Sequence, residues 1–215
     1  LRIVVIIPVF NEAQHIRICL ESFNNQTYKN INWVIVNDSS TDDSLQLIEA
    51  FIKDKPDFTL ISLTYTSEHI PGAKVVRTFY TGLNSVSLSE FDIIVKLDAD
   101  IILPPHYFET LVKELEQDPE IGIIGGLVSI EKNGKWVYEN ISNKNHVRGP
   151  IKTYRKSCFE DIGGLRETLG WDNLDILLAK MHGWKIKVIP DLWVKHMKPT
   201  AQVYKKTKSE KLGTY

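Results

Sequence analysis

The sequence contains few cysteines, since Cys19 and Cys158 are the only two in 215 residues and lie far apart in the chain. A disulfide framework and a cysteine-based zinc site are therefore excluded, and a reducing compartment fits. We expect Cys19 to be a core thiol, because it falls among apolar helix positions. Long apolar runs are also missing, as no window approaches the roughly 18 apolar residues of a membrane span. The N-terminus lacks the cationic start and cleavage site of a signal peptide.

Excess charge and glycine-rich loops are missing as well. The formal net charge is −1, so no basic field attracts nucleic acid and we expect no nucleic-acid partner. The first predicted strand is followed by PVFNE (residues 8–12) rather than by a glycine-rich loop. This argues against dinucleotide dehydrogenases and against nucleotidyltransferases of similar sheet order. The composition, 43% hydrophobic and 25% charged, is typical of a globular protein with one large domain.

The first half of the chain contains apolar, β-branched runs separated by helical patterns. These runs do not alternate apolar with polar residues, which indicates an α/β fold with a parallel sheet covered by helices on both faces. Asn11 is a candidate cap for the first helix, and Pro104 and Pro105 open the last helix of this half. The predicted strands cover residues 2–10, 32–38, 58–65 and 91–97, and the intervening helices include residues 16–23, 41–52 and 71–87.

From residue 118 the pattern changes, and we expect a second wall of the same domain rather than a second domain. Asn133-Gly134 is a type I′ turn signal between two strand-like runs, and Ser157 is a candidate helix cap. The polar tail 204–215 follows a chain that begins in a strand without Met, so we expect the sequence to be cut from a longer protein. The predicted elements are a hairpin (121–130 and 135–141), helices over 157–164 and 172–183, and a strand over 184–190.

Polar side chains follow three of the predicted parallel strands at their carboxyl ends: Asn11-Glu12, Asn37-Asp38 and Asp98 with Asp100. Ligands of parallel α/β sheets bind beyond these ends. Two carboxylates at i and i+2 leave an extended strand on the same side, and Mg²⁺ or Mn²⁺ is held by such oxygens together with substrate phosphates. The stretch VKLDADIILPP (95–105) therefore suggests a metal–diphosphate site, although solvated turn residues would give the same pattern.

Four stretches in this order resemble the family-2 glycosyltransferases with the GT-A fold, and the resemblance spans essentially the whole chain. They are PVFNE (8–12), VNDSSTDDS (36–44), VKLDADIILPP (95–105) and GGLRETLGWDNLDILLAKMHGWK (163–185). The resemblance implies one GT-A domain over residues 1–203, with a Rossmann-like, mostly parallel sheet. Residues 1–117 would form the nucleotide-binding half, and residues 118–203 the smaller acceptor-side half.

Three positions depart from the family pattern. Asn37-Asp38 stands for the usual Asp-Asp, Trp171-Asp172 for the usual Glu-Asp, and Lys180 for the arginine often found later in that helix. A module that binds a nucleotide sugar but has lost catalysis is therefore an alternative to an active enzyme.

The resemblance implies transfer of a sugar from a nucleotide-diphosphate sugar, with UDP as the favoured nucleotide, to an acceptor hydroxyl with inversion at the anomeric carbon. It also implies Mn²⁺ or Mg²⁺ as cofactor. Asp98 is expected at the ribose or beside the metal, and Asp100 as the direct ligand. His196 is expected as a third ligand or a diphosphate contact. The implied nucleotide-site residues are Pro8, Val9, Glu12, Asp38, Arg77 and Asp98.

The resemblance makes Asp172 the catalytic base. The alternatives are that Asp172 only caps its helix, or that Asp175, one turn later, is the base. Trp171 is either an apolar platform for a sugar or a core aromatic, and Arg148-Gly149 would border the donor sugar. By resemblance we also expect a glycan or lipid-linked acceptor, a role in cell-surface glycan synthesis, and a cytoplasmic location. That location is expected at the inner face of the membrane, with peripheral attachment through regions outside this sequence.

Overall fold

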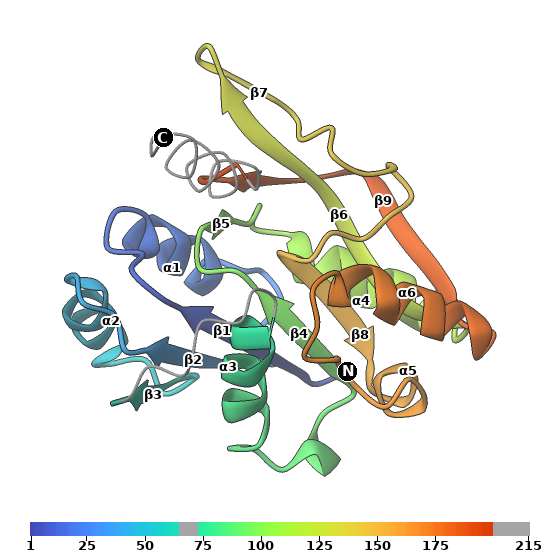
Figure 1. Ribbon diagram of the computed structural model, residues 1–215, viewed down its shortest axis with the longest axis horizontal. Helices are drawn as coiled ribbons and strands as arrows, with labels where there is room; N and C mark the ends of the chain where they lie inside the picture. Colours follow the sequence, from blue (N-terminus) through green and yellow to red (C-terminus); the bar gives the residue numbers. More distant parts are fainter. Residues whose placement is uncertain (65–72, 200–215) are drawn as a thin grey trace, which may run out of the picture.

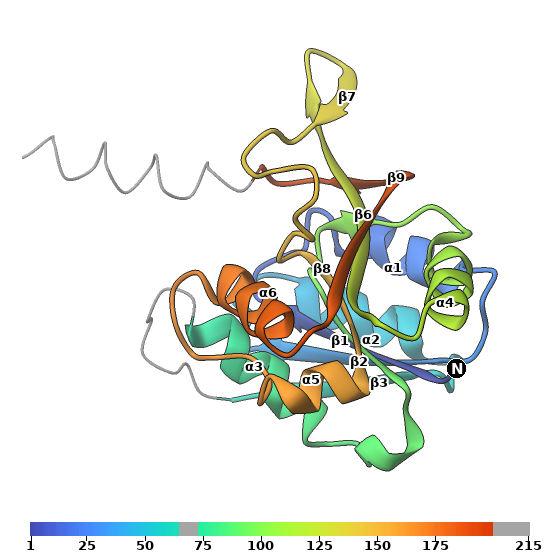
Figure 2. The ribbon, with the colours of Figure 1, turned by 90° about the vertical axis from the view of Figure 1, so that its right-hand side faces the viewer.

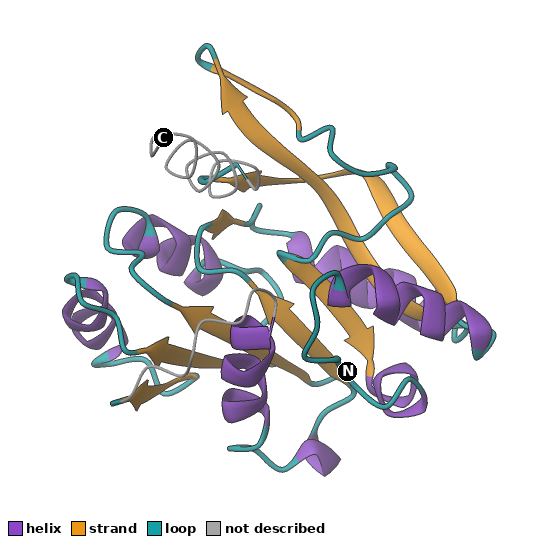
Figure 3. Cartoon of the chain, in the orientation of Figure 1, coloured by secondary structure: helices purple, strands orange, loops and turns teal. Residues whose placement is uncertain are grey.

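The computed structural model describes residues 1–64 and 73–199, and strands alternate with helices along the first half of the chain (Figure 3). Three predicted segments lie partly or wholly outside the described residues: the last residue of the strand 58–65, the first two residues of the helix 71–87, and the tail 204–215. The strands are β1 (Ile3–Val9), β2 (Ile31–Asp38), β3 (Phe58–Leu63), β4 (Ile93–Leu97), β5 (Ile101–Ile102), β6 (Ile121–Lys132), β7 (Lys135–Tyr138), β8 (Ile151–Arg155) and β9 (Lys185–His196). The helices are α1 (Ile16–Asn24), α2 (Ser44–Ile52), α3 (Ala73–Leu83), α4 (Tyr107–Gln117), α5 (Lys156–Asp161) and α6 (Trp171–Met181), with a short 3-10 helix at Leu88–Glu90.

All these strands belong to one sheet, in the order β3-β2-β1-β4-β8-β6-β9-β5, with β7 paired to β6 (Figure 1). β1 pairs in parallel with β2 and β4, and β2 pairs in parallel with β3. This confirms the Rossmann-like parallel half predicted from the apolar runs. The carboxyl ends of β1, β2 and β4 therefore lie along one edge, where ligands of such sheets bind.

A hydrophobic core fills each face of the sheet, and different helices cover the two faces (Figure 2). α1, α2 and α4 pack on one face, with Phe23 and Phe108 among the buried side chains. α3, α5 and α6 pack on the other face, with Phe79 and Phe159 in the core. The fully buried Cys19 lies in the first core, as predicted for a core thiol.

The second half makes the sheet mixed and differs from the predicted elements. β8 was not predicted, because Lys152 and Thr153 make it look polar, yet both side chains are buried. β8 lies antiparallel to β4 and to β6, while β6 and β9 are parallel. β9 runs to His196, well beyond the predicted end at residue 190, and pairs there with β5. This extension brings the end of the described chain back to the edge where β4 ends.

Two predicted helix caps are wrong, and one predicted turn is confirmed. α1 begins at Ile16 with His15 at its N-cap, because Asn11 is used by a neighbouring loop instead. Ser157 lies inside α5, whose N-cap is Arg155. The predicted type I′ turn is confirmed in its geometry, since Asn133 and Gly134 have φ of 52° and 73°.

The predicted division of the domain at residues 117 and 118 stays a prediction, since β8 and β9 of the second half extend the sheet of the first. Among the described residues, no helix is both long enough and apolar enough to cross a bilayer.

Gly126 allows β6 and β9 to approach closely at an irregularity in their pairing. A Cβ atom at this position would lie 2.2 Å from the backbone oxygen of Leu192. We therefore expect Gly126→Ala to lower the free energy of unfolding by about 1–3 kcal/mol, because the strands must move apart. Urea denaturation measures the change, with exposed Glu131→Ala on the same strand as a control expected within about 0.5 kcal/mol of the parent. Equal stability of Gly126→Ala and the parent would contradict the close approach.

Candidate functional site

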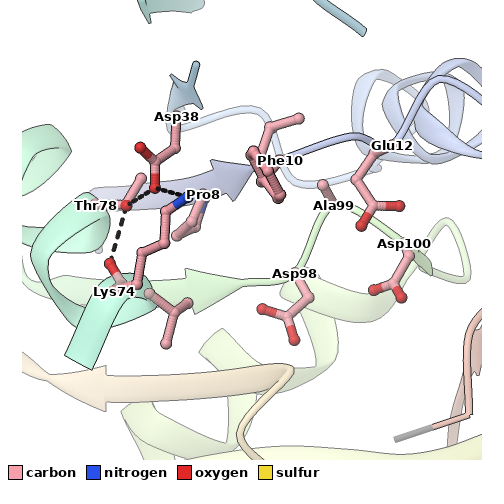
Figure 4. Close-up of a pocket in the computed structure, with 11 residues that line it drawn as sticks. Pro8, Phe10, Glu12, Asp38, Lys74, Thr78, Asp98, Ala99 and Asp100 are labelled. Carbon is pink, nitrogen blue, oxygen red and sulfur yellow. Dashed lines mark hydrogen bonds and ion pairs between the residues drawn. The ribbon is translucent and has the colours of Figure 1, made fainter. Parts of the chain in front are cut away.

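The ends of β1, β2 and β4 surround a pocket of about 310 Å³, a volume typical of small-molecule sites. Figure 4 shows a carboxylate, Asp38, at one end beside Lys74 and Thr78, and the acidic side chains Glu12, Asp98 and Asp100 at the other end. Six residues predicted for the site therefore line one hollow. The lining residues are Pro8, Val9, Phe10, Glu12, Asp38, Lys74, Val75, Thr78, Asp98, Ala99 and Asp100.

The loops after β1 and β2 hold each other in place. Asn11 and Ser39 have φ of 54° and 56°, and Asn tolerates this left-handed region better than most residues. The Asn11 side-chain oxygen accepts a hydrogen bond from the backbone N–H of Thr41 at 2.8 Å. In return, the backbone N–H of Glu12 donates to the hydroxyl of Ser44 at 2.7 Å. These bonds between two loops fix the Glu12 backbone and explain why Asn11 does not cap α1.

Asp38 is directed into the pocket rather than toward a helix end. Its carboxylate accepts a hydrogen bond from Thr78 Oγ1 at 2.8 Å and lies 3.5 Å from Lys74 Nζ. The same ammonium group lies 3.9 Å from the centre of the Phe10 ring, which is 46% exposed. Asp38 does not cap the following helix, because the N-cap of α2 is Asp43. This end of the pocket thus offers a carboxylate, an ammonium group and an open aromatic face.

Arg77 lies one turn after Lys74 on α3 and is not among the lining residues. Its guanidinium forms an ion pair with Glu167 at 2.7 Å. The predicted nucleotide contact of Arg77 stays a prediction, and the structure places Lys74 beside Asp38 instead. Sequence reasoning missed Lys74, although it lies in the same predicted helix as Arg77.

Each carboxylate at the other end of the pocket is paired with a cation of the protein. Glu12 Oε2 lies 2.5 Å from Lys198 Nζ, Asp98 pairs with the buried Lys96, and Asp100 Oδ2 lies 3.3 Å from His196 Nε2. Burial raises the pKa of Glu12 to about 7, with the charges of Asp100 and Asp98 adding to the effect and Lys198 opposing it. Negative charge is therefore concentrated here beyond what the local cations remove.

His196 connects this acidic cluster to a second buried ion pair. Its Nδ1 lies 3.2 Å from Glu139 Oε2, and Arg148 lies 3.1 Å from the same oxygen. Although burial opposes it, hydrogen bonds to Asp100 and Glu139 raise the pKa of His196 to about 9. His196 is therefore protonated at neutral pH and could bind a metal only after losing that proton.

The donor set suits a hard divalent cation. Glu12, Asp98 and Asp100 offer oxygen atoms, and burial, with the charges of Asp100 and Asp98 adding to it, raises the pKa of Glu12. Within residues 1–64 and 73–199, no group of three or more His, Cys, Asp or Glu side chains is arranged so that it could hold a metal ion by itself. The residues therefore fit a cation whose remaining ligands come from substrate phosphates and water.

Asp172 lies in the first turn of α6, and a chain of contacts links it to the acidic cluster. Lys96 Nζ, which pairs with Asp98, also donates to the backbone oxygen of Gly149 at 3.3 Å. A Cβ atom at Gly149 would lie 3.1 Å from Asp172 Oδ2, so this backbone passes directly beside the carboxylate. Gly170, with φ of 76°, is the N-cap of α6, so the alternative that Asp172 only caps the helix is wrong.

The environment of Asp172 keeps it ionised. The facing ring of His146, with Nε2 4.0 Å from Oδ2, lowers the pKa of Asp172, burial opposes that effect, and the charge of Lys152 lowers the pKa further. Sequence reasoning missed His146 and Lys152, because their proximity depends on β8 and the loop before it. Lys96 belongs to the stretch 95–105, and a lysine inside an apolar strand is unusual enough to be a signal in the sequence.

Asp175 and Trp171 both have structural partners in the interior of the protein. Asp175 is buried, with one carboxylate oxygen bonded by Lys152 Nζ at 2.9 Å and the other by the hydroxyl of Tyr154. Trp171 belongs to the hydrophobic core on the α6 side, with Lys96 Nζ 5.2 Å from its ring centre. These contacts favour the core interpretation of Trp171 and leave Asp172 as the accessible carboxylate of α6.

Comparison with known proteins identifies close similarity to glycosyltransferases. The family model described as glycosyl transferase family 2 matches residues 4–166. The glycosyltransferase GlyA of Streptococcus pneumoniae is 32% identical over 162 residues, which are 75% of this chain and 21% of GlyA. The chain therefore spans about a fifth of the length of that relative.

Two solved structures show the same fold. The mannosyltransferase PcManGT from Pyrobaculum calidifontis, in complex with GDP-Man and Mn²⁺, has a TM-score of 0.71 and 23% identity, covering 98% of this chain and 61% of that one. TarS from S. aureus, in complex with UDP-GlcNAc, has a TM-score of 0.71 and 20% identity, covering 92% of this chain and 59% of that one. The mixed sheet and its helices therefore have the GT-A architecture.

The raised pKa of Glu12 predicts a specific pH dependence of stability. Between its ordinary pKa of 4.5 and about 7, folded Glu12 holds a proton that the unfolded chain has lost. The contribution of Glu12 to stability therefore falls as pH rises through this window. In Glu12→Gln this loss should be absent, so the variant gains stability relative to the parent between about pH 5 and pH 7.

Urea denaturation at several pH values measures that difference. Exposed Glu49→Gln on α2 is the matched control and should follow the parent across the whole range. A Glu12→Gln curve parallel to that of the parent would contradict the proposed charge crowding.

Proposed function

The chain belongs to glycosyl transferase family 2 and has the GT-A fold, and we propose that it transfers a sugar from a nucleotide-diphosphate sugar to an acceptor hydroxyl. The proposed donor is a UDP-sugar, and the proposed outcome is inversion at the anomeric carbon. One observation carries the proposal. A single pocket joins a carboxylate-and-aromatic end at Asp38 to an acidic end at Asp98 and Asp100, and Lys96, which pairs with Asp98, also bonds the Gly149 backbone beside Asp172.

The nucleoside is proposed to occupy the end of the pocket at Asp38, which already accepts a hydrogen bond from Thr78. A carboxylate there can accept the ring N–H of uracil, and the exposed Phe10 face is available to an aromatic base. Pro8, Val9 and Glu12 line the path from this end to the acidic end and are proposed to border base and ribose. The assignment to uracil follows the resemblance of the stretch around Asp38.

The diphosphate is proposed to lie at the acidic end. Asp100, with Asp98, would hold Mn²⁺ or Mg²⁺, whose charge, when bound, neutralises the negative charge that develops on the leaving diphosphate. Lys96 keeps Asp98 in position, and His196 does the same for Asp100. The structures of PcManGT with Mn²⁺ and of TarS with a nucleotide sugar support this placement by similarity of fold.

Asp172 is proposed to accept the proton of the acceptor hydroxyl as the new glycosidic bond forms. Its lowered pKa keeps it ionised and makes it a weak base. A weak base suffices, because the hydroxyl becomes acidic as its oxygen bonds to the anomeric carbon. Direct inversion requires the base and the leaving group on opposite faces of the sugar. We propose that the carboxylate beside Gly149 faces the acceptor, while Asp100 serves the leaving group.

The proposed acceptor is a hydroxyl of a glycan or a lipid-linked sugar, in the synthesis of cell-surface glycans. The proposed setting is the inner face of the cytoplasmic membrane, with attachment through parts of the protein outside residues 1–215. The direct test of activity is release of UDP from UDP-sugars in the presence of Mn²⁺, with GDP-sugars in parallel. Binding of UDP-sugar without any release would favour the alternative of a binding module.

Replacement of Asp100 tests the metal assignment. Asp100→Asn should weaken UDP binding in the presence of Mn²⁺ by at least about tenfold, since even residues that only support a metal ligand cost 10–100-fold in affinity. Isothermal titration calorimetry with and without Mn²⁺ measures the effect, and exposed Asp191→Asn is the control. An unchanged Mn²⁺ dependence in Asp100→Asn would refute the assignment.

Replacement of Asp172 tests the assignment of the base. Asp172→Asn keeps the size of the side chain but cannot take a proton at neutral pH, so kcat should fall by about 10²–10⁴-fold. The affinity for UDP-sugar should stay unchanged, because Asp172 is not among the residues that line the donor pocket. Near-normal turnover would place the base elsewhere.

A further inference from the structure

The segment from residue 139 to residue 150, between β7 and β8, brings a histidine to the side of Asp172. His146 Nε2 lies 4.0 Å from Asp172 Oδ2, and the two side chains are 15% and 29% exposed. No part of the proposed donor site requires a histidine at this position, because His146 is not among the residues that line the donor pocket.

The backbone around His146 is held on both sides. The N–H of His146 donates to the backbone oxygen of Asn143 at 2.9 Å, in a turn closed also by the Asn143 side chain. Val147 is fully buried in the core, and Arg148 is paired with buried Glu139 at 3.1 Å. His146 is therefore fixed toward Asp172 by its neighbours.

Asp172 is held from its backbone. The buried ammonium of Lys152 donates to the backbone oxygen of Asp172 at 2.7 Å and to Asp175 at 2.9 Å. The glycine at position 149 leaves the space beside Oδ2 open, where a Cβ atom would come within 3.1 Å. The carboxylate itself has only one further side-chain partner given by the described contacts, since Asn173 Nδ2 lies 3.4 Å from Oδ1.

We propose that His146 is a positioning residue for Asp172: its Nε2 faces Oδ2 across 4.0 Å, so that Oδ1, which lies 3.4 Å from Asn173 Nδ2, is the oxygen that faces the acceptor hydroxyl. The inference rests on the proposed function, in which Asp172 is the base. A carboxylate can rotate about its terminal bond, and a donor on one oxygen selects one orientation. In the reaction the acceptor O–H proton passes to Oδ1 and the acceptor oxygen bonds to the anomeric carbon. The bond from that carbon to the diphosphate oxygen breaks, and the nucleoside diphosphate leaves with the electron pair.

The charges around the pair are consistent with this role. The facing ring of His146 is the main cause that lowers the pKa of Asp172, and Lys152 of β8 acts in the same direction. Asp175 on the same helix is paired with Lys152 and Tyr154, while Lys96 of β4 is paired with Asp98. Of the groups named here, Lys96 and Lys152 each form an ion pair with another aspartate, whereas His146 faces Asp172.

Kinetics of three histidine variants test the role. His146→Ala should lower kcat by about 10–100-fold, as for other residues that orient a reacting group, with the KM for UDP-sugar unchanged. The acidic limb of the kcat–pH profile should move to higher pH, since the main cause of the lowered pKa is gone. His146→Gln retains an N–H donor and should recover part of the loss. His182→Ala, at the C-cap of the helix that carries Asp172, should match the parent.

A measurement without turnover separates this inference from the proposed function. The ring signals of His146 can be recorded by NMR at one fixed pH in the parent and in Asp172→Asn. Loss of the facing carboxylate should change the chemical shifts of the His146 ring, whereas Asp191→Asn should leave them unchanged. If no sugar is transferred by the parent, the proposed function fails while this contact is still measured. Unchanged His146 ring signals in Asp172→Asn, or an active parent whose kcat and acidic limb survive His146→Ala, would overturn the inference.

Discussion

The crowding of carboxylates where β1 and β4 end is the constraint on which the rest of the site depends. Glu12, Asp98 and Asp100 converge at one edge of the sheet, partly removed from water, where like charges repel strongly. The protein meets this repulsion by pairing each carboxylate with its own cation. Asp98 pairs with Lys96 of β4, and Asp100 pairs with His196 at the end of β9. Glu12 pairs with Lys198, two residues after β9.

This pairing explains why the second half of the fold must return to the first. The parallel strands supply the carboxylates, but a sheet that ended at β4 would leave Glu12 and Asp100 without their cations. β9 crosses the sheet and pairs with β5, which places His196 next to Asp100. A divalent cation in this cluster would compete with the proton of His196, since both neutralise Asp100. If the proposed metal binds at Asp100, its binding would therefore be linked to loss of the proton on His196.

The sequence predicts the parallel half well and the mixed half poorly, for a physical reason. Strands buried on both faces leave long apolar runs, and their carboxyl ends share an edge, so the grouping of Glu12, Asp38 and Asp98 follows from order alone. β8 escapes detection because its buried Lys152 is tolerated only through partners on α6, namely Asp175 and the backbone oxygen of Asp172.

Local sequence rules fail where a distant group competes for the same side chain. Asn11 has the chemistry of a helix cap, but its oxygen bonds the loop after β2 instead. Lys74 and Arg77 are equally plausible on one helix, and the position of Asp38 selects Lys74. Likewise, β4 and β8 place Lys96 directly opposite Lys152, where like charges destabilise a sheet unless each is neutralised. Lys96 forms an ion pair with Asp98, and Lys152 forms one with Asp175. One of the two aspartates of α6 is therefore used to neutralise a buried lysine. Asp172 keeps its carboxylate outside these two pairs, and for this reason the proposed function assigns the base to Asp172 rather than to Asp175.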